Sequence, residues 1–337
     1  MSDQHLQSIL FSRVKSMLPS DVSIADFLAD LLMISKDSVY RRLKGEKQLS
    51  FNELAKIATA FNISLDELFN LGKRNVVFHG QFVNSENFNL ESYLQSMLKN
   101  VELITKYDNK ELFYICKDIP VFYYLMFPEI AAFKFFVWTK TQMQFEEMKN
   151  RKFSFSILTP ELHELCNKIS ACYTMIPGAE ILNADNILTD LRQLEYYKDT
   201  NMYENINDQA ILYDKFTEMV AHMEAQAASG RKCLPGKDPD LKAGPVKVYV
   251  NDFFVGDNTI IAIINEMRMV YLNHAAINFI STASGEFADY NYEFIQNIIK
   301  KSSLISVVGE RDRKKFFNLI LERIDQFKVK DIQSFSN

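Results

Sequence analysis

The sequence predicts a mainly α protein, with a compact unit of five short helices followed by a larger helix-rich α+β module that carries a small antiparallel sheet. Three observations support this fold class. Helix-start signals cluster within the first seventy residues, and apolar residues recur at helical spacing through most of the remainder. After residue 245, short alternating or β-branched runs indicate three strands.

The composition is that of a soluble globular chain large enough for two or three domains, with 47% hydrophobic and 24% charged residues among 337. The amino terminus lacks the pattern of a secretory signal, and the most apolar stretch, residues 119–138, is interrupted by Pro128, Glu129 and Lys134. The four cysteines show no zinc-type spacing. We therefore expect a cytoplasmic protein with reduced thiols, no metal site, no cofactor and no membrane contact.

The first helix is indicated by apolar residues at helical spacing from Leu6 to Leu18, followed by Pro19. Three later helices begin with a serine placed three residues before an acid, the arrangement of a capping box. Apolar residues flank each box at the spacing of a hydrophobic staple, and Ser35 begins a further helix with Ile34 and Val39 as its staple. The three boxes are Ser23–Asp26, Ser50–Glu53 and Ser64–Glu67.

The second and third predicted helices are separated by a very short turn. The second helix begins after Ser23 and ends near Leu32, and Met33 with Ile34 forms the turn. The third helix begins after Ser35 and ends before Gly45, a residue that commonly terminates helices. This is the layout of a helix-turn-helix, whose second helix lies in the major groove of DNA.

Charge is distributed unevenly along the chain. Residues 1–74 carry ten basic and nine acidic side chains, whereas the remainder carries 28 basic and 34 acidic ones. Within residues 36–47, five basic residues accompany only two acidic ones. A local basic excess on an otherwise acidic chain favours a DNA-facing segment at the predicted third helix.

The segment from Ile24 to Phe69 resembles the helix-turn-helix domains of the Cro and phage-repressor (xenobiotic-response-element) type. The sequence departs from that family's pattern at Met33, where glycine is most frequent, so we expect a left-handed backbone at this residue. The matching features are Ala29, Ile34-Ser35, Val39, Arg41, Gly45, Glu53-Leu54, Ile57-Ala58, Ile63-Ser64, Asp66 and Leu68.

The resemblance implies two sets of DNA contacts. Basic side chains early in the recognition helix can donate to guanine, and an aspartate can accept from cytosine. Hydroxyl groups and further basic residues are suited to phosphates. The implied base-contacting residues are Lys36, Asp37, Tyr40 and Arg41, and the implied phosphate-contacting residues are Ser23, Ser35, Arg42, Lys44 and Lys47.

Beyond residues 1–74 we expect four segments. Residues 75–89 form a linker, residues 90–228 a helical effector or dimerisation region, residues 229–245 a flexible loop, and residues 246–330 an α+β region. The apolar stripe that includes Leu94 and Leu98 is either a core face or a dimer seam. The aromatic segment 113–138 is either an effector pocket or, more commonly for such sequences, an aromatic core.

The predicted sheet has three strands, at 246–250, 259–264 and 267–272. No catalytic motif is complete: His163 and Glu164 begin a zinc-protease motif, but Asn167 stands where its second histidine is required. We therefore expect no enzyme. The leading hypothesis is a sequence-specific, homodimeric transcription regulator that binds double-stranded DNA. Its carboxy-terminal module would serve sensing of a small-molecule or protein effector, or oligomerisation. The alternative is an antitoxin-like or other protein-interaction module with autoregulatory DNA binding.

Overall fold

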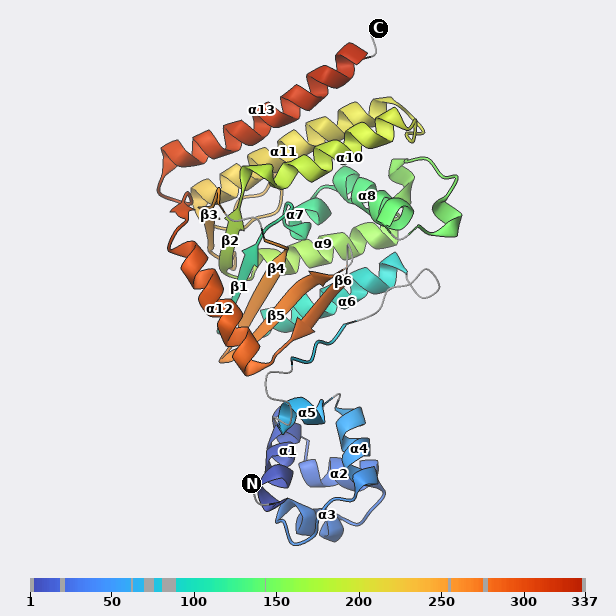
Figure 1. Ribbon diagram of the computed structural model, residues 1–337, viewed down its shortest axis with the longest axis vertical. Helices are drawn as coiled ribbons and strands as arrows, with labels where there is room; N and C mark the ends of the chain where they lie inside the picture. Colours follow the sequence, from blue (N-terminus) through green and yellow to red (C-terminus); the bar gives the residue numbers. More distant parts are fainter. Residues whose placement is uncertain are drawn as a thin grey trace. The chain divides into compact units, whose positions relative to one another are not determined.

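The computed structural model describes residues 3–18, 22–61, 63–69, 76–80, 89–142, 144–253, 256–274 and 278–334. The chain divides into two compact units, Met1–Val77 and Phe78–Asn337 (Figure 1). Within the predicted linker 75–89, residues 75 and 81–88 lie outside the described residues. Each unit has its own hydrophobic core.

The described residues of the first unit form five helices. Small and branched aliphatic side chains of these helices make up its core. Leu10 and Val14 from the first helix meet Leu28, Val39 and Ile57 from the next three. The rings of Phe27 and Phe61 extend this core. The helices are α1 (Asp3–Met17), α2 (Ile24–Leu32), α3 (Lys36–Leu43), α4 (Phe51–Ala60) and α5 (Leu65–Leu68).

The second unit combines long helices with a sheet whose strands come from both halves of its sequence. Its helical elements are α6 (Leu90–Thr105), α7 (Val121–Met126), α8 (Pro128–Val137), the π-helical turn η1 (Trp138–Gln142), η2 (Glu146–Met148), η3 (Phe155–Ile157), α9 (Pro160–Thr174), η4 (Ala184–Ile187), α10 (Leu188–Asp199), α11 (Asn207–Ser229), α12 (Gly285–Ile299) and α13 (Glu310–Ser334). Its strands are β1 (Lys110–Ile115), β2 (Gly178–Leu182), β3 (Val246–Val250), β4 (Thr259–Ile264), β5 (Met267–His274), β6 (Asn278–Thr282) and β7 (Ser303–Leu304).

The prediction of a small antiparallel sheet is wrong, because the described strands form one seven-stranded mixed sheet in the order β6-β5-β4-β1-β2-β3-β7. β1, β2 and β3 run parallel to one another, and the other pairs are antiparallel. β1 and β2 arise from residues 90–228, which we predicted to be helical. Most of β1 and all of β2 are buried on both faces. Such strands have no apolar–polar alternation, so short apolar runs of this kind cannot be distinguished from buried helix by pattern.

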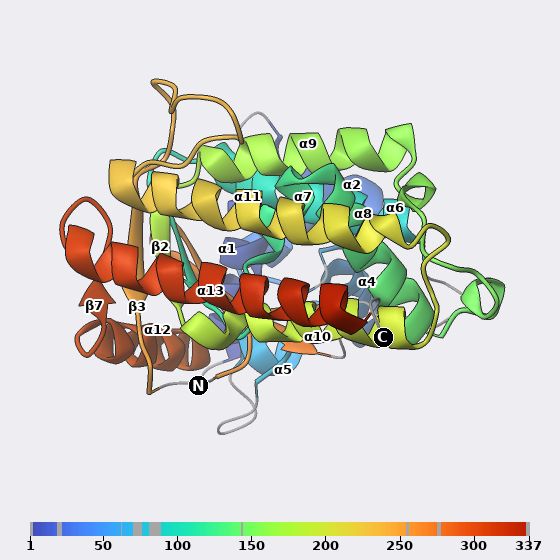
Figure 2. The same cartoon turned by 90° about the horizontal axis from the view of Figure 1, so that it is seen from above.

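The two faces of the sheet have different coverings (Figures 1 and 2). Leu112 and Tyr114 of β1 face a large core that includes residues of α6 to α11 and α13. Phe113 and Ile115, which alternate with them, face a smaller core completed by α12. On the larger side, α11 and α13 lie next to each other (Figure 2).

The apolar stripe of α6 is a core face. Leu94 is fully buried, and Val101 and Ile104 are nearly so, in the core that α6 forms with α9. The stripe is therefore not free to act as a dimer seam. The aromatic segment 113–138 is likewise buried within the second unit, including Phe133, Phe135 and Phe136.

No helix among the described residues is long and apolar enough to cross a membrane. Within the same ranges, no group of three or more His, Cys, Asp or Glu side chains is arranged to hold a metal ion.

Candidate nucleic-acid interface

The turn between α2 and α3 is set by hydrogen bonds at the end of α2. Met33 adopts the left-handed conformation expected for it, with φ 53° and ψ 49°. The next amide, Ile34 N–H, donates to the carbonyl of Ala29 at 3.1 Å. A non-glycine residue in this conformation costs about 1 kcal/mol, and the Met33 side chain itself is 87% exposed. The chain thus leaves α2 sharply and enters α3 after only three residues.

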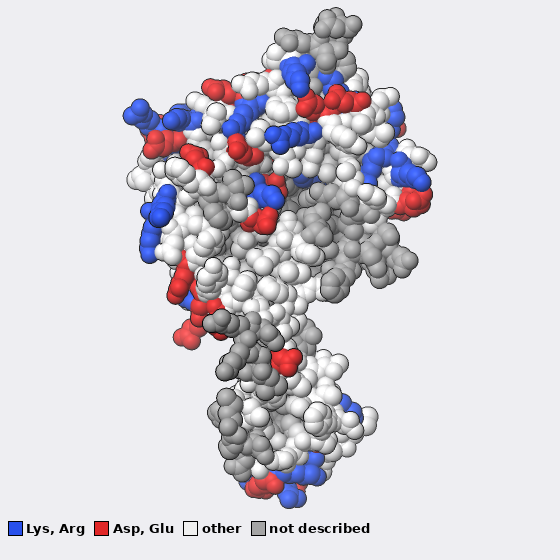
Figure 3. Space-filling view, viewed as in Figure 1, with Lys and Arg blue, Asp and Glu red and all other residues white. Residues whose placement is uncertain are grey.

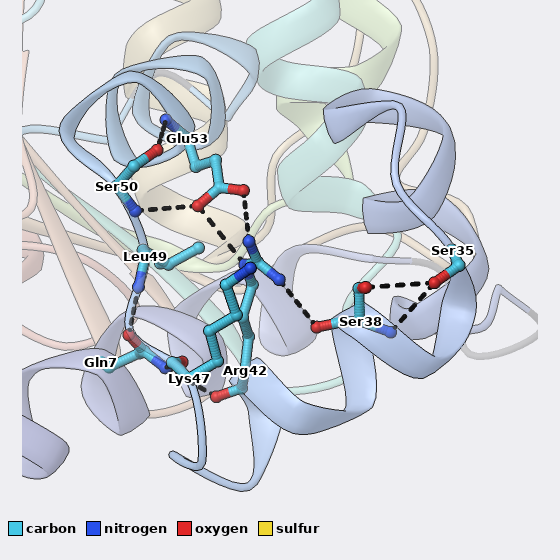
Figure 4. Close-up of polar contacts among 8 residues, drawn as sticks. All are labelled: Gln7, Ser35, Ser38, Arg42, Lys47, Leu49, Ser50 and Glu53. Carbon is cyan, nitrogen blue, oxygen red and sulfur yellow. Dashed lines mark hydrogen bonds and ion pairs between the residues drawn. The ribbon is translucent and has the colours of Figure 1, made fainter.

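Ser35 fixes the start of α3. Its hydroxyl accepts from the Ser38 amide at 3.3 Å and donates to the Ser38 hydroxyl at 3.1 Å (Figure 4). Val39, one turn into the helix, is buried in the core of the first unit. Because Val39 points inward, the opposite side of α3 faces solvent.

The solvent-facing side chains of α3 define a single surface, which we call the exposed face of α3. It consists of Lys36, Asp37, Tyr40 and Arg41, with Lys44 just after the helix, all exposed. Their positions follow the three-to-four-residue spacing that places residues on one side of a helix. The structure thus brings together the four predicted base-contacting residues and one predicted phosphate contact. Figure 3 shows basic and acidic side chains side by side at the α3 end of this unit.

Two ion pairs border this face, and both are exposed. Lys36 Nζ lies 2.6 Å from Asp26 Oδ1, and Arg41 Nε lies 3.8 Å from Glu46 Oε2. A hydrogen bond to Asp26 raises the pKa of Lys36, so this ammonium group stays charged. Exposed pairs of this kind contribute little to stability. Lys36 and Arg41 can therefore exchange these partners for groups on DNA.

Arg42, one of the predicted phosphate contacts, has its side chain inside the domain. Its side chain is only 5% exposed. Its guanidinium donates from Nη2 to Glu53 Oε1 at 2.7 Å and from Nε to Oε2 at 3.4 Å, while Nη1 donates to the Ser38 carbonyl at 3.0 Å (Figure 4). With these donors engaged inside the domain, the geometry gives no support to a phosphate contact. Arg42 instead holds α3 against α4.

Glu53 serves both the Arg42 pair and the cap of α4. Its Oε2 accepts from the Ser50 amide at 2.8 Å, and its own amide donates to Ser50 Oγ at 3.3 Å, which completes a capping box. Burial acts to raise the pKa of Glu53, but hydrogen bonds from Ser50 and Arg42 outweigh it and lower the pKa. The carboxylate is therefore ionised and stays paired with Arg42 at neutral pH.

Gln7 on α1 fastens the loop that follows α3, a role that sequence reasoning missed. Its Nε2 donates to the carbonyls of Arg42 at 2.7 Å and Lys47 at 3.0 Å, and its Oε1 accepts from the Leu49 amide at 2.9 Å (Figure 4). Nothing in the local pattern marks a glutamine on the first helix as a partner of residues about forty positions later. Together with the Arg42–Glu53 pair, it fixes the orientation of α3.

The other predicted phosphate contacts lie beside the exposed face of α3. Ser23 is exposed at the start of α2, where its hydroxyl accepts from the Asp26 amide at 3.5 Å. Ser35 is exposed as the cap of α3, and Lys47 is exposed in the loop before α4. These contacts, like the base contacts, stay predictions.

Residues 24–68 match the family model of the helix-turn-helix, and these residues run from α2 to the end of α5. The amino-terminal unit is therefore a helix-turn-helix domain of the Cro and repressor type. The presence of this domain supports a DNA-binding transcription regulator. No curated protein and no solved structure matches the chain.

Proposed function

We propose that the protein is a homodimeric, sequence-specific transcription regulator that contacts bases through the exposed face of α3 and senses an effector through its second unit. The observation that carries the proposal is the grouping of Lys36, Asp37, Tyr40 and Arg41 on one solvent-facing side of the recognition helix. That helix is held in place by Arg42, Glu53 and Gln7, so its side chains are presented in a fixed orientation.

The chemistry of this face suits direct contact with base edges. Arg41 can donate two hydrogen bonds to guanine O6 and N7, and Lys36 can donate to the same acceptors. Asp37 can accept from the amino group of cytosine. Lys44, at the end of the helix, is placed for the phosphate backbone. A set that combines donors with an acceptor can recognise both guanine and cytosine edges in the major groove.

Dimerisation follows from the small size of the exposed face. One recognition helix contacts only a few base pairs, and domains of this type bind two half-sites about one helical turn apart as dimers. Residues 75–337 carry 28 basic and 34 acidic side chains, an acidic excess that disfavours contact with phosphates. This charge balance supports DNA contact by the first unit alone. In the proposal, the second unit forms the dimer interface and binds the effector. An effector would act by favouring one spacing of the two DNA-binding domains.

Selection of duplexes from a random library by the full chain tests the proposal. We expect an enriched palindrome that disappears with Arg41→Ala. Lys56→Ala is the matched control, because Lys56 is an exposed lysine on α4 and does not belong to the exposed face of α3. Absence of enrichment at low salt would contradict the proposal and favour the protein-interaction alternative.

A further inference from the structure

A cavity of about 320 Å³ opens on the second unit between α10 and the end of α8 with its π-helical turn. Val137 and the rings of Tyr196 and Tyr197 give it an apolar wall. Arg192 also lines it, together with hydroxyl and amide side chains. Cavities of this size and mixed lining accommodate small organic ligands.

Arg192 is the charged group that lines this cavity. Its side chain is exposed, and it forms no ion pair with any residue that the structure describes. Its neighbours along α10 differ, because Asp190 is paired with Lys134 and Glu195 with Lys330. A planar guanidinium without a partner, next to an apolar wall, suits a carboxylate joined to an apolar body.

Asp190, which lies between the cavity-lining residues Thr189 and Arg192 in the sequence, is held in a buried ion pair. Lys134 Nζ lies 2.7 Å from Asp190 Oδ1, and the Tyr124 hydroxyl donates to Asp190 Oδ2 at 2.8 Å. Both side chains of this ion pair are almost fully buried, and its charges cancel. Gln193, which lines the cavity, accepts from Lys134 Nζ at 3.0 Å through its side-chain oxygen. With its oxygen engaged by Lys134, the side-chain nitrogen of Gln193 is the donor that this residue can offer a ligand.

The backbone at the cavity has an unusual conformation. Residues Trp138–Gln142 continue α8 as a π-helical turn, a feature that occurs frequently at functional sites. Thr141 on this turn lines the cavity and forms a hydroxyl–hydroxyl hydrogen bond with Tyr197 of α10. The turn therefore joins the two walls of the cavity through these hydroxyls.

We propose that this cavity binds a small organic carboxylate. The carboxylate group of the ligand accepts hydrogen bonds from Arg192 and from the side-chain amide of Gln193. The apolar part of the ligand packs against Val137 and Tyr196. The inference rests on the proposed function in one respect, because the ligand would be the effector that the second unit senses. The binding itself requires no DNA and can be measured without it.

Ligand-detected nuclear magnetic resonance with the full chain tests this site. The probes are phenylacetate, 4-phenylbutyrate and indole-3-acetate, each compared with its primary amide and with acetate. We expect at least one aromatic carboxylate to bind, with its amide and acetate each at least about 10-fold weaker, because a charge-assisted hydrogen bond and an apolar contact are both required. Arg192→Gln should weaken binding of that carboxylate at least about 10-fold.

Two further variants separate the site from general effects. Thr189→Phe places a ring at an exposed position of the cavity lining and should abolish binding without changing charge. Arg311→Gln removes an exposed arginine on α13, which is not part of the cavity, and should leave binding unchanged.

Absence of binding by all three carboxylates, or equal binding by Arg192→Gln, would overturn the proposed site. Equal affinity for the amides would also overturn it. DNA selection that succeeds while carboxylate binding fails removes only the cavity proposal. Carboxylate binding that succeeds while DNA selection fails removes only the proposed function.

Discussion

Replacing Arg42 by methionine tests whether this residue holds the recognition helix in place. The substitution preserves much of the buried side-chain volume but removes the two hydrogen bonds to Glu53 and the one to the Ser38 carbonyl. The partner variant, Glu53→Gln, removes the negative charge yet keeps an oxygen that can accept from the Ser50 amide. The pair therefore separates the contribution of the ion pair from that of the helix cap.

The magnitude follows from burial. The side chains of Arg42 and Glu53 are 5% and 16% exposed, so either charge left without its partner is poorly solvated. Breaking such a pair costs about 3 kcal/mol for Arg42→Met. Glu53→Gln costs about 2 kcal/mol, the value of a hydrogen bond to a charged group. The double variant should lose about 2 kcal/mol less stability than the sum of the losses of the two single variants, and this difference is the coupling energy of the pair.

Hydrogen–deuterium exchange of the full chain, followed by mass spectrometry, reports these energies for residues 36–60. A loss of 3 kcal/mol corresponds to exchange about 100-fold faster in α3 and α4. Peptides from the second unit, such as α9, serve as the internal control and should exchange at unchanged rates. Additive effects of the two substitutions would show that Arg42 and Glu53 do not stabilise each other. If Arg42→Met weakens DNA binding while exchange in α3 stays unchanged, Arg42 contacts a phosphate directly and does not hold the helix in place.

Three further predictions concern pH and packing. Because the folded pKa of Glu53 is lowered from 4.5, its charge contributes stability above about pH 4.5 that is lost as pH falls through the folded pKa. Exchange protection of α3 and α4 should therefore decline in acid more steeply in the wild type than in Glu53→Gln, and parallel declines would contradict this. Leu94→Ala should cost the second unit about 3 kcal/mol, since Leu94 is fully buried. Urea unfolding followed by fluorescence of the single tryptophan, Trp138, measures this loss, and a loss below about 1 kcal/mol would argue against a core position. Burial lowers the pKa of Lys232 from 10.5 to about 8, so between these values the unfolded chain holds a proton that the folded chain has released. Wild-type stability should accordingly rise by about 3 kcal/mol relative to Lys232→Met across this window, and a constant difference in urea unfolding energies would disprove the shift.

The amino-terminal unit could be predicted because its signals are local. The Ser50–Glu53 box lies within four residues, and the structure shows both of its hydrogen bonds. Val39 faces the core as the staple and helical spacing indicate, which leaves Lys36 and Arg41 on the solvent side. Caps, staples and helical periodicity depend on residues within a few positions of each other, so a single sequence contains them.

The features that were missed depend on residues far apart in the chain. β1 and β2 pair at Leu112 and Gly178, and neither strand shows alternation because both faces are covered. A side chain at Gly178 would collide with the Leu112 carbonyl, but that constraint exists only once the strands meet. The partner of Arg42 likewise lies on another helix. The sequence shows that Arg42 is basic, but tertiary packing decides whether its side chain points into the domain or toward solvent.

The most direct test of base contact by α3 measures the affinity of the full chain for the selected palindrome and for a duplex with one symmetric base-pair change in each half-site. If Arg41 contacts a base, Arg41→Ala should weaken binding to the palindrome by about 1–3 kcal/mol per half-site and remove discrimination at one base-pair position. Lys56→Ala should change neither quantity. An Arg41→Ala protein that keeps wild-type affinity and wild-type discrimination at every position would show that Arg41 contacts no base.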